Sequence, residues 1–80
     1  MHSDILPQLR RLLSDLFPDE NVDSALSLFT SGVLDSIALL EVVSRIEQHF
    51  HVRFSWSEVN LDNLDSLEKM TDFIIRKLQG

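Results

Sequence analysis

One serine stands where a phosphate ester could be held. Ser36 follows the run Gly32-Val33-Leu34-Asp35 and opens a segment whose apolar residues have helical spacing. The first backbone N–H groups of a helix have no partner within it, and the helix dipole is positive there, so an attached anionic group is stabilised. Ser36 is therefore a candidate for carrying a phosphodiester. The alternative is an ordinary serine at a helix start beside a capping Asp35.

A hydrolytic role for Ser36 lacks the residues that it would need. A serine nucleophile requires a neighbouring base, and His49 and His51 stand at the far end of the same predicted helix. Their spacing of two residues does not place two metal ligands on one helical face. The chain has no cysteine, which excludes disulfides, thiolate metal sites and a catalytic thiol. If the protein handles thioesters, the sulfur must come from a cofactor.

The chain is short and acidic, with 80 residues and a formal net charge of −6. Residues 1–80 are expected to form a single domain, too small for the large clefts of most enzymes. Residues 12–68 carry eleven acidic and two basic side chains. This balance repels nucleic acid and anionic membranes and attracts a partner with a basic face. The alternative is a solvated acidic surface that only aids solubility.

No part of the sequence is expected to insert into a membrane. No apolar run approaches the ~18 residues that a spanning helix needs. The N-terminus lacks the basic start and apolar centre of a signal peptide. We therefore expect a cytoplasmic protein.

Apolar residues at helical spacing predict an all-α, four-helix fold. Glycine and proline occur twice each, too rarely for an architecture rich in β-hairpins. A long loop over residues 18–35 is expected to pack by its own side chains, with a helical turn near residues 23–27. The expected helices, three longer and one short, span residues 5–17, 36–50, 55–61 and 65–78.

Capping residues indicate where the last two helices begin. Ser55 with Glu58, and Asp65 with Glu68, have the spacing of a capping box, in which a side chain at the helix start and one three residues later bond each other's backbone N–H groups. The short helix is therefore expected to start at Ser55 and the closing helix at Asp65.

The spacing of residues in the central helix, 36–50, separates a core face from a face directed at solvent. The face directed at solvent should be polar, yet it begins with two aliphatic side chains, Ile37 and Leu40, beside Glu41. Either Ile37 packs under the preceding loop and Leu40 is an isolated exposed residue, or the pair belongs to a partner site. The opposite, core-facing side is expected to contain Leu39, Val42, Val43, Ile46 and Phe50.

Phe54 and Trp56 follow the central helix in an alternating stretch. A lone strand would have no partner here, so the alternation does not indicate one. With so few bases nearby, the two rings do not make a platform for stacking nucleic-acid bases. We expect both in a satellite of the core.

The run Leu28-Phe29-Thr30-Ser31-Gly32-Val33-Leu34-Asp35-Ser36-Ile37, with the helix that follows it, resembles the phosphopantetheine attachment region of acyl carrier proteins. The resemblance covers almost the whole chain and implies the acyl-carrier four-helix bundle, with its long loop between the first and second helices. In that family the serine of an Asp-Ser-Leu motif bears 4′-phosphopantetheine, derived from coenzyme A, whose thiol holds the cargo as a thioester. The resemblance thus implies attachment at Ser36, next to Asp35, and no catalysis by the chain itself.

A second stretch, Asp65-Ser66-Leu67, matches the three-residue motif more closely than Asp35-Ser36-Ile37 does. Its context argues against it. Ser36 follows a loop that contains glycine and opens a helix with an apolar and acidic outer face, whereas Ser66 is expected to be part of the cap of the closing helix. The sequence therefore favours Ser36.

The resemblance also implies a surface that partner enzymes read. In carriers of this kind the central helix offers acids that meet basic residues and aliphatic side chains that dock. The matching positions here are Ile37, Leu40, Glu41 and Glu47. The partners implied are a phosphopantetheinyl transferase, an adenylating or other acyl-loading enzyme, and downstream acyl-processing enzymes.

Departures from the fatty-acid carriers bear on the cargo. This chain has Ala38, Gln48 and His49 where those carriers are more acidic, with Arg45 between them. The run from Gly32 to Ser36 is closer to D-alanyl carriers and to stand-alone carriers of amino or short hydroxy acids. We therefore expect a free-standing, monomeric carrier of a short amino or hydroxy acid. The alternatives are a fatty-acid or polyketide carrier and, as a different class, an acidic helical interaction module without a prosthetic group.

Overall fold

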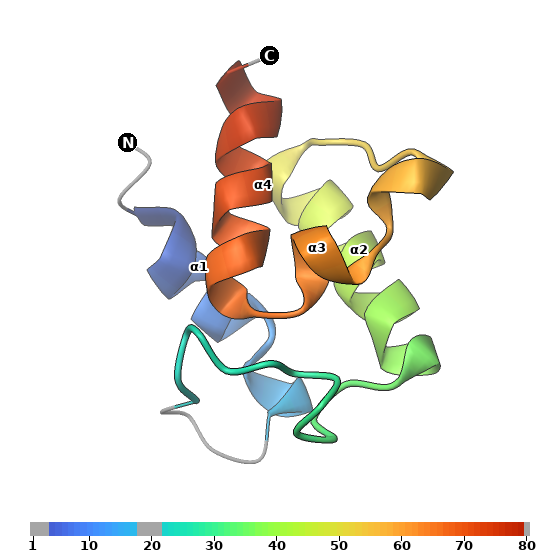
Figure 1. Ribbon diagram of the computed structural model, residues 1–80. Coiled ribbons are helices and arrows are strands. Elements are labelled where there is room, and N and C mark those ends of the chain that lie inside the picture. The colour runs from blue at the N-terminus through green and yellow to red at the C-terminus, as the bar shows by residue number, and fades with distance from the viewer. Residues whose placement is uncertain (1–3, 18–21, 80) are drawn as a thin grey trace.

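The computed structural model describes residues 4–17 and 22–79, and all regular structure in these two ranges is helical (Figure 1). The absence of strands there confirms the all-α fold, and the helix lengths confirm three longer helices and a short one. The elements are α1 (Ile5–Leu12), η2 (Ser14–Leu16), α2 (Ser36–Phe50), η3 (Trp56–Glu58), α3 (Leu61–Leu64) and α4 (Leu67–Gln79), where η denotes a single 3₁₀ turn.

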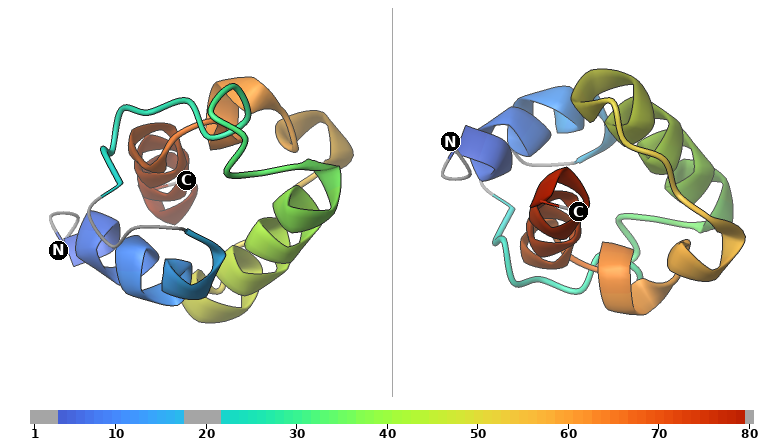
Figure 2. Two further views of the ribbon diagram at one scale, coloured as in Figure 1. Left: turned by 90° about the horizontal axis from the view of Figure 1, so that it is seen from below. Right: turned by 90° about the horizontal axis from the view of Figure 1, so that it is seen from above.

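Helix α4 is the element around which the others are arranged. α1 and α3 both pack against it. Viewed along α4, the bundle shows α1, α2, α3 and the segment of residues 22–35 placed around it (Figure 2). Each helix can therefore turn one apolar face to a shared core and leave the other face outside.

The core combines residues from all four helices and from the loop. Val42, Val43 and Ile46 of α2 are buried as expected, while Leu39 and Phe50 pack at its edge. Burying an aliphatic side chain of this size contributes about 1.5–3 kcal/mol. The side chains with essentially no exposed surface are Leu9, Leu13, Leu28, Val42, Ile46, Leu64, Leu67, Met70 and Ile74.

Of the predicted 18–35 loop, residues 18–21 lie outside the described residues, and the described part, 22–35, packs through its own side chains as predicted. Leu28 and Leu34 are buried in the core. The expected turn is present, because the Leu26 N–H donates to the Asp23 carbonyl at 3.1 Å. These contacts hold the segment against the bundle, and it leads directly into α2.

Asp65 fastens this segment to the start of α4. Its carboxylate accepts hydrogen bonds from the Ser27 hydroxyl at 2.7 Å and from the Phe29 N–H at 3.1 Å. The expectation that Asp65 begins the last helix is wrong. Ser66 caps α4 instead, accepting from the Lys69 N–H at 3.1 Å. The Asp65 side chain is diverted because loop donors distant in sequence lie beside it.

Two further predicted boundaries differ from the structure. The first helix ends at Leu12 and is followed by η2, rather than running on to Phe17 as one helix. The capping box of Ser55 and Glu58 is present, but it starts only η3. A separate α3 begins after Asn60, whose side chain accepts from the Asn63 N–H at 3.0 Å.

The two aromatic residues expected in a satellite of the core behave differently. Phe54 is half-buried and stacks on Phe73, with ring centroids 4.7 Å apart. Trp56 is 87% exposed, so its expected burial is wrong. Its position in η3, outside any helix face that meets the core, leaves the indole at the surface.

Candidate functional site

Ser36 is the first residue of α2 and lies at the surface. Asp35 caps the helix, because its Oδ1 accepts the Ala38 N–H at 2.8 Å and its carbonyl accepts the Leu39 N–H at 2.9 Å. The N–H groups of Ser36 and Ile37 have no backbone acceptor among the described residues. An exposed hydroxyl thus stands beside two N–H donors at the positive end of a four-turn helix, which suits an attached phosphate.

A buried anchor and a glycine turn bring Ser36 to this place. Gly32 has a φ of +83°, a left-handed conformation that a residue with a Cβ adopts only with strain. After this turn the chain returns inward at Leu34, which is 3% exposed and whose N–H donates to the Leu28 carbonyl at 3.0 Å. Asp35 and Ser36 then emerge at the surface.

Ser66 has the opposite environment. It is 4% exposed, and its hydroxyl is used in the cap of α4, where it accepts the Lys69 N–H. An enzyme could reach this hydroxyl only by opening the first turn of α4. Burial thus separates two serines that carry nearly the same three-residue motif.

The outer face of α2 is apolar at its start. Ile37 is 80% exposed and Leu40 is 57% exposed, so Ile37 does not pack under the preceding loop. Glu41 is exposed beside them and pairs with Arg45, the Nε–Oε1 distance being 3.2 Å. The structure therefore places Ile37, Leu40 and Glu41 on one accessible surface that begins next to Ser36.

Glu47 has an intramolecular partner that the sequence did not predict. Its Oε2 accepts a hydrogen bond from the Phe54 N–H at 2.8 Å, in a part-buried contact. The carboxylate thereby ties the connection after α2 back to the helix. Both acidic positions of the expected partner face thus have a partner within the chain, but Glu41 pairs with the side chain of Arg45 whereas Glu47 accepts a backbone N–H.

Arg45 is a second residue whose role the sequence did not show. Its guanidinium donates to both oxygens of Asp15 and to the Leu12 carbonyl, which joins the end of α1 to the middle of α2. The hydrogen bond from Arg45 holds the pKa of the Asp15 carboxyl below its ordinary value, and the same pair raises the pKa of Arg45. Arg45 also offsets part of the negative charge of Glu41.

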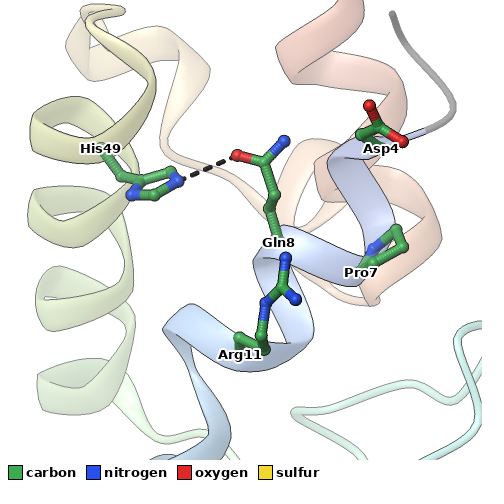
Figure 3. Close-up of a pocket in the computed structure, with 5 residues that line it drawn as sticks. All are labelled: Asp4, Pro7, Gln8, Arg11 and His49. Atoms are coloured by element: carbon green, nitrogen blue, oxygen red, sulfur yellow. Dashed lines mark hydrogen bonds between the residues drawn. The ribbon is translucent and has the colours of Figure 1, made fainter.

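A hollow of about 310 Å³ lies at the other end of α2, and His49 is one of the residues that line it (Figure 3). The Nε2 of His49 lies 3.0 Å from the Oε1 of Gln8 on α1. His49 is in the last turn of α2, roughly 20 Å from Ser36 at about 1.5 Å per residue. It therefore cannot act as a base for Ser36. Within residues 4–17 and 22–79, no group of three potential metal-binding side chains comes together.

Comparison with known proteins agrees with this geometry. Residues 7–74 match the family described as "Phosphopantetheine attachment site". The chain belongs to this family of carrier domains. Its members are carriers without catalytic activity, and their prosthetic group is 4′-phosphopantetheine. The exposed serine at a helix N-terminus fits such a group, since it offers a hydroxyl for the ester and N–H donors for the phosphate.

Two curated relatives are D-alanyl carrier proteins. The one from Streptococcus mutans serotype c (strain ATCC 700610 / UA159) is 29% identical over 72 residues, covering 89% of this carrier and 91% of the relative. The one from Streptococcus sanguinis (strain SK36) is also 29% identical, over 70 residues that cover 86% and 89% of the two chains. In the described part of this carrier, no helix has the length and apolar character needed to cross a membrane.

Proposed function

We propose that this carrier holds an aminoacyl group as a thioester on 4′-phosphopantetheine esterified to the Ser36 hydroxyl. The observation that carries the proposal is the exposure of Ser36 at the start of α2, in contrast to the burial of Ser66. When bound, the group supplies the thiol that this cysteine-free chain lacks. In this proposal residues 1–80 form a single domain. The carrier is a monomer and acts in the cytoplasm.

Each residue near Ser36 has a separate task in this proposal. Asp35 fixes the first turn of α2, and the N–H groups of Ser36 and Ile37, which have no backbone acceptor in the described ranges, stabilise the phosphate. Ile37 and Leu40 dock apolar groups of the partner enzymes, and Glu41 meets a basic residue. Glu47 borders this surface and holds the connection to Phe54 in place.

The partners follow from the chemistry of the arm. A phosphopantetheinyl transferase must attach it: the Ser36 oxygen bonds to the phosphorus next to the pantetheine, the bond from that phosphorus to the bridging oxygen of the coenzyme A diphosphate breaks, and adenosine 3′,5′-bisphosphate leaves. The proton of the hydroxyl passes to a base of the transferase. An adenylating enzyme must then activate the carboxylate of the cargo for thioester formation, and downstream enzymes must remove the acyl group. An amino acid as the cargo is supported by the likeness to D-alanyl carrier proteins over most of both chains.

The cargo can be tested on protein isolated from the organism that makes it. The carrier is purified at acidic pH, which preserves thioesters, and its intact mass is recorded before and after treatment with hydroxylamine. We expect a phosphopantetheinylated protein that releases an aminoacyl hydroxamate. Release of a long-chain acyl hydroxamate would instead identify a fatty-acid carrier, and a protein without the arm would support the interaction module.

A further inference from the structure

An apolar hollow opens between α2 and η3, next to the face that begins at Ser36. It has a volume of about 190 Å³. Two of its walls are large exposed side chains, Leu40 at 57% and Trp56 at 87%. Tryptophan is highly buried on average in folded domains, and an exposed apolar surface to which several neighbouring side chains contribute marks an interaction site. The lining residues are Leu40, Val43, Glu47, Phe54, Trp56 and Val59.

The residues that line the hollow favour an apolar group as its occupant. Among the described residues that line the hollow, Glu47 is the one with a charged side chain, and its carboxylate already accepts the Phe54 N–H. The remaining lining side chains are aliphatic or aromatic. A charged or strongly polar group entering the hollow would therefore lose water without gaining a strong partner.

The volume of the hollow fits a single side chain. A cavity of about 150 Å³ is enough for one benzene ring, whereas pockets for small-molecule ligands usually measure about 300–1,000 Å³. At about 190 Å³, the hollow takes one aromatic or branched aliphatic side chain. It is too small for a phosphopantetheine arm together with its cargo.

The distance of the hollow from Ser36 indicates which partner protein supplies the side chain that enters it. Leu40 lies one helical turn after Ser36, about 6 Å along α2. The enzyme that esterifies Ser36 must cover this turn. It also binds coenzyme A, which carries several phosphate groups, so its surface around the active site must be basic. That surface complements the acidic balance of residues 12–68, which includes Glu41, the residue after Leu40, and the exposed Asp62 in the first turn of α3.

We propose that the hollow between Leu40 and Trp56 receives an apolar side chain of the phosphopantetheinyl transferase, and that Trp56 is the main anchor of that contact. This inference rests on the proposed attachment at Ser36. Tryptophan is enriched among the few residues that dominate binding energy at interfaces. Because Trp56 makes no part of the buried core, its removal affects docking and leaves the fold intact.

The test measures transfer from coenzyme A to the apo-protein by a broad-specificity phosphopantetheinyl transferase. Trp56→Ala should raise the KM for the carrier at least about 10-fold with little change in kcat, since docking precedes the chemical step. Trp56→Phe should retain most of the wild-type KM. Leu78→Ala is the matched control, because Leu78 is also exposed, at 51%, but lies near the end of α4. Its KM should equal that of the wild type.

Three outcomes would overturn the proposal. The first is an unchanged KM for a folded Trp56→Ala variant. The second is a blue shift of tryptophan emission in purified holo-protein relative to apo-protein, measured with no enzyme present. Because Trp56 is the sole tryptophan in the sequence, such a shift would show that the arm itself occupies the hollow. The third is a wild-type protein that the transferase does not modify, which would also contradict the proposed function, whereas the first two outcomes leave that function intact.

Discussion

At the scale of single residues, burial and hydrogen bonding distinguish side chains that the sequence leaves equivalent. Two three-residue motifs have nearly the same residue types, Asp35-Ser36-Ile37 and Asp65-Ser66-Leu67. In the structure one serine is exposed at the start of α2, and the other is buried in the cap of α4. Glu41 and Glu47 diverge in the same way, because only Glu47 is held by a backbone N–H.

Removing the charge of Glu41 should weaken recognition by partner enzymes. In Glu41→Gln we expect kcat/KM for modification to fall about 2- to 5-fold, the range of an exposed charge pair. The rate should also become less sensitive to salt, because steering by surface charge is screened. Transferase assays at low and high ionic strength measure both effects.

Gln48→Lys is the control for this prediction. It changes the net charge by the same amount on the same helix, from another exposed position. It should have a smaller effect than Glu41→Gln. Equal effects from the two variants would mean that only overall charge matters, and that Glu41 has no specific partner.

At the scale of the elements, helical periodicity predicts α1, α2 and α4, but contacts between distant residues decide where the connections and caps lie. The 3.6-residue pattern of Val42, Val43 and Ile46 is visible in the sequence. That Asp65 bonds Ser27 and Phe29 is not visible, since these residues are far apart along the chain. The division of the predicted short helix into η3 and α3 has a similar origin, in the Asn60 cap.

Asp65→Ala should loosen the segment that leads into α2. The Phe29 N–H and the Ser27 hydroxyl would lose their acceptor, at a cost of about 1–3 kcal/mol in the free energy of unfolding. Denaturant titration measures this loss, and hydrogen exchange should be faster at the Phe29 amide. Asp62→Ala, at an exposed position without these bonds, should change neither quantity appreciably. Similar behaviour of the two variants would contradict the account of Asp65.

The junction of η3 and α4 should depend on pH. Glu58 Oε1 lies 2.8 Å from the Lys77 ammonium and accepts the Ser55 N–H at 2.9 Å, and these contacts lower the Glu58 pKa from its ordinary value of 4.5. A lowered carboxyl pKa stabilises the fold above the ordinary value, and the contribution is lost as the pH falls through the folded-state pKa.

Glu58→Gln should therefore unfold at a lower temperature than the wild type near pH 7. The difference should shrink as the pH falls below about 4.5. Thermal unfolding followed by circular dichroism from pH 7 to pH 3 tests this. A difference that stays constant over the whole range would show that the ionised carboxylate contributes nothing.

At the scale of the whole molecule, the core and the surface have separate functions. The fully buried Val42 and Ile46 form the inner side of α2, while its outer side presents Ile37 and Leu40 beside Ser36. The division into two faces could be predicted from spacing, but whether Ile37 is exposed or packs under the preceding loop could not. The exposure of Trp56 could not, because an alternating aromatic stretch is compatible with burial or exposure and only the path of the connection after α2 decides between them.

The packed core predicts how cargo affects stability. A long acyl chain entering beneath α2 would have to displace packed side chains, and overpacking typically costs about 1–3 kcal/mol. Holo-protein loaded with an amino acid should have the same thermal midpoint as unloaded holo-protein, and a long acyl chain should not raise it. Marked stabilisation by a long chain, with methyl NMR shifts centred on Leu39 and Ile46, would contradict a short cargo but not the carrier function.

The most direct test of the central claim is the location of the arm. Apo-protein is incubated with coenzyme A and a phosphopantetheinyl transferase, digested, and mapped by tandem mass spectrometry, with Ser36→Ala and Ser66→Ala treated in parallel. We predict one phosphopantetheine group on Ser36 in the wild type and in Ser66→Ala, and none on folded Ser36→Ala. A group mapped to Ser66, or a folded Ser36→Ala that is still modified, would contradict the assignment.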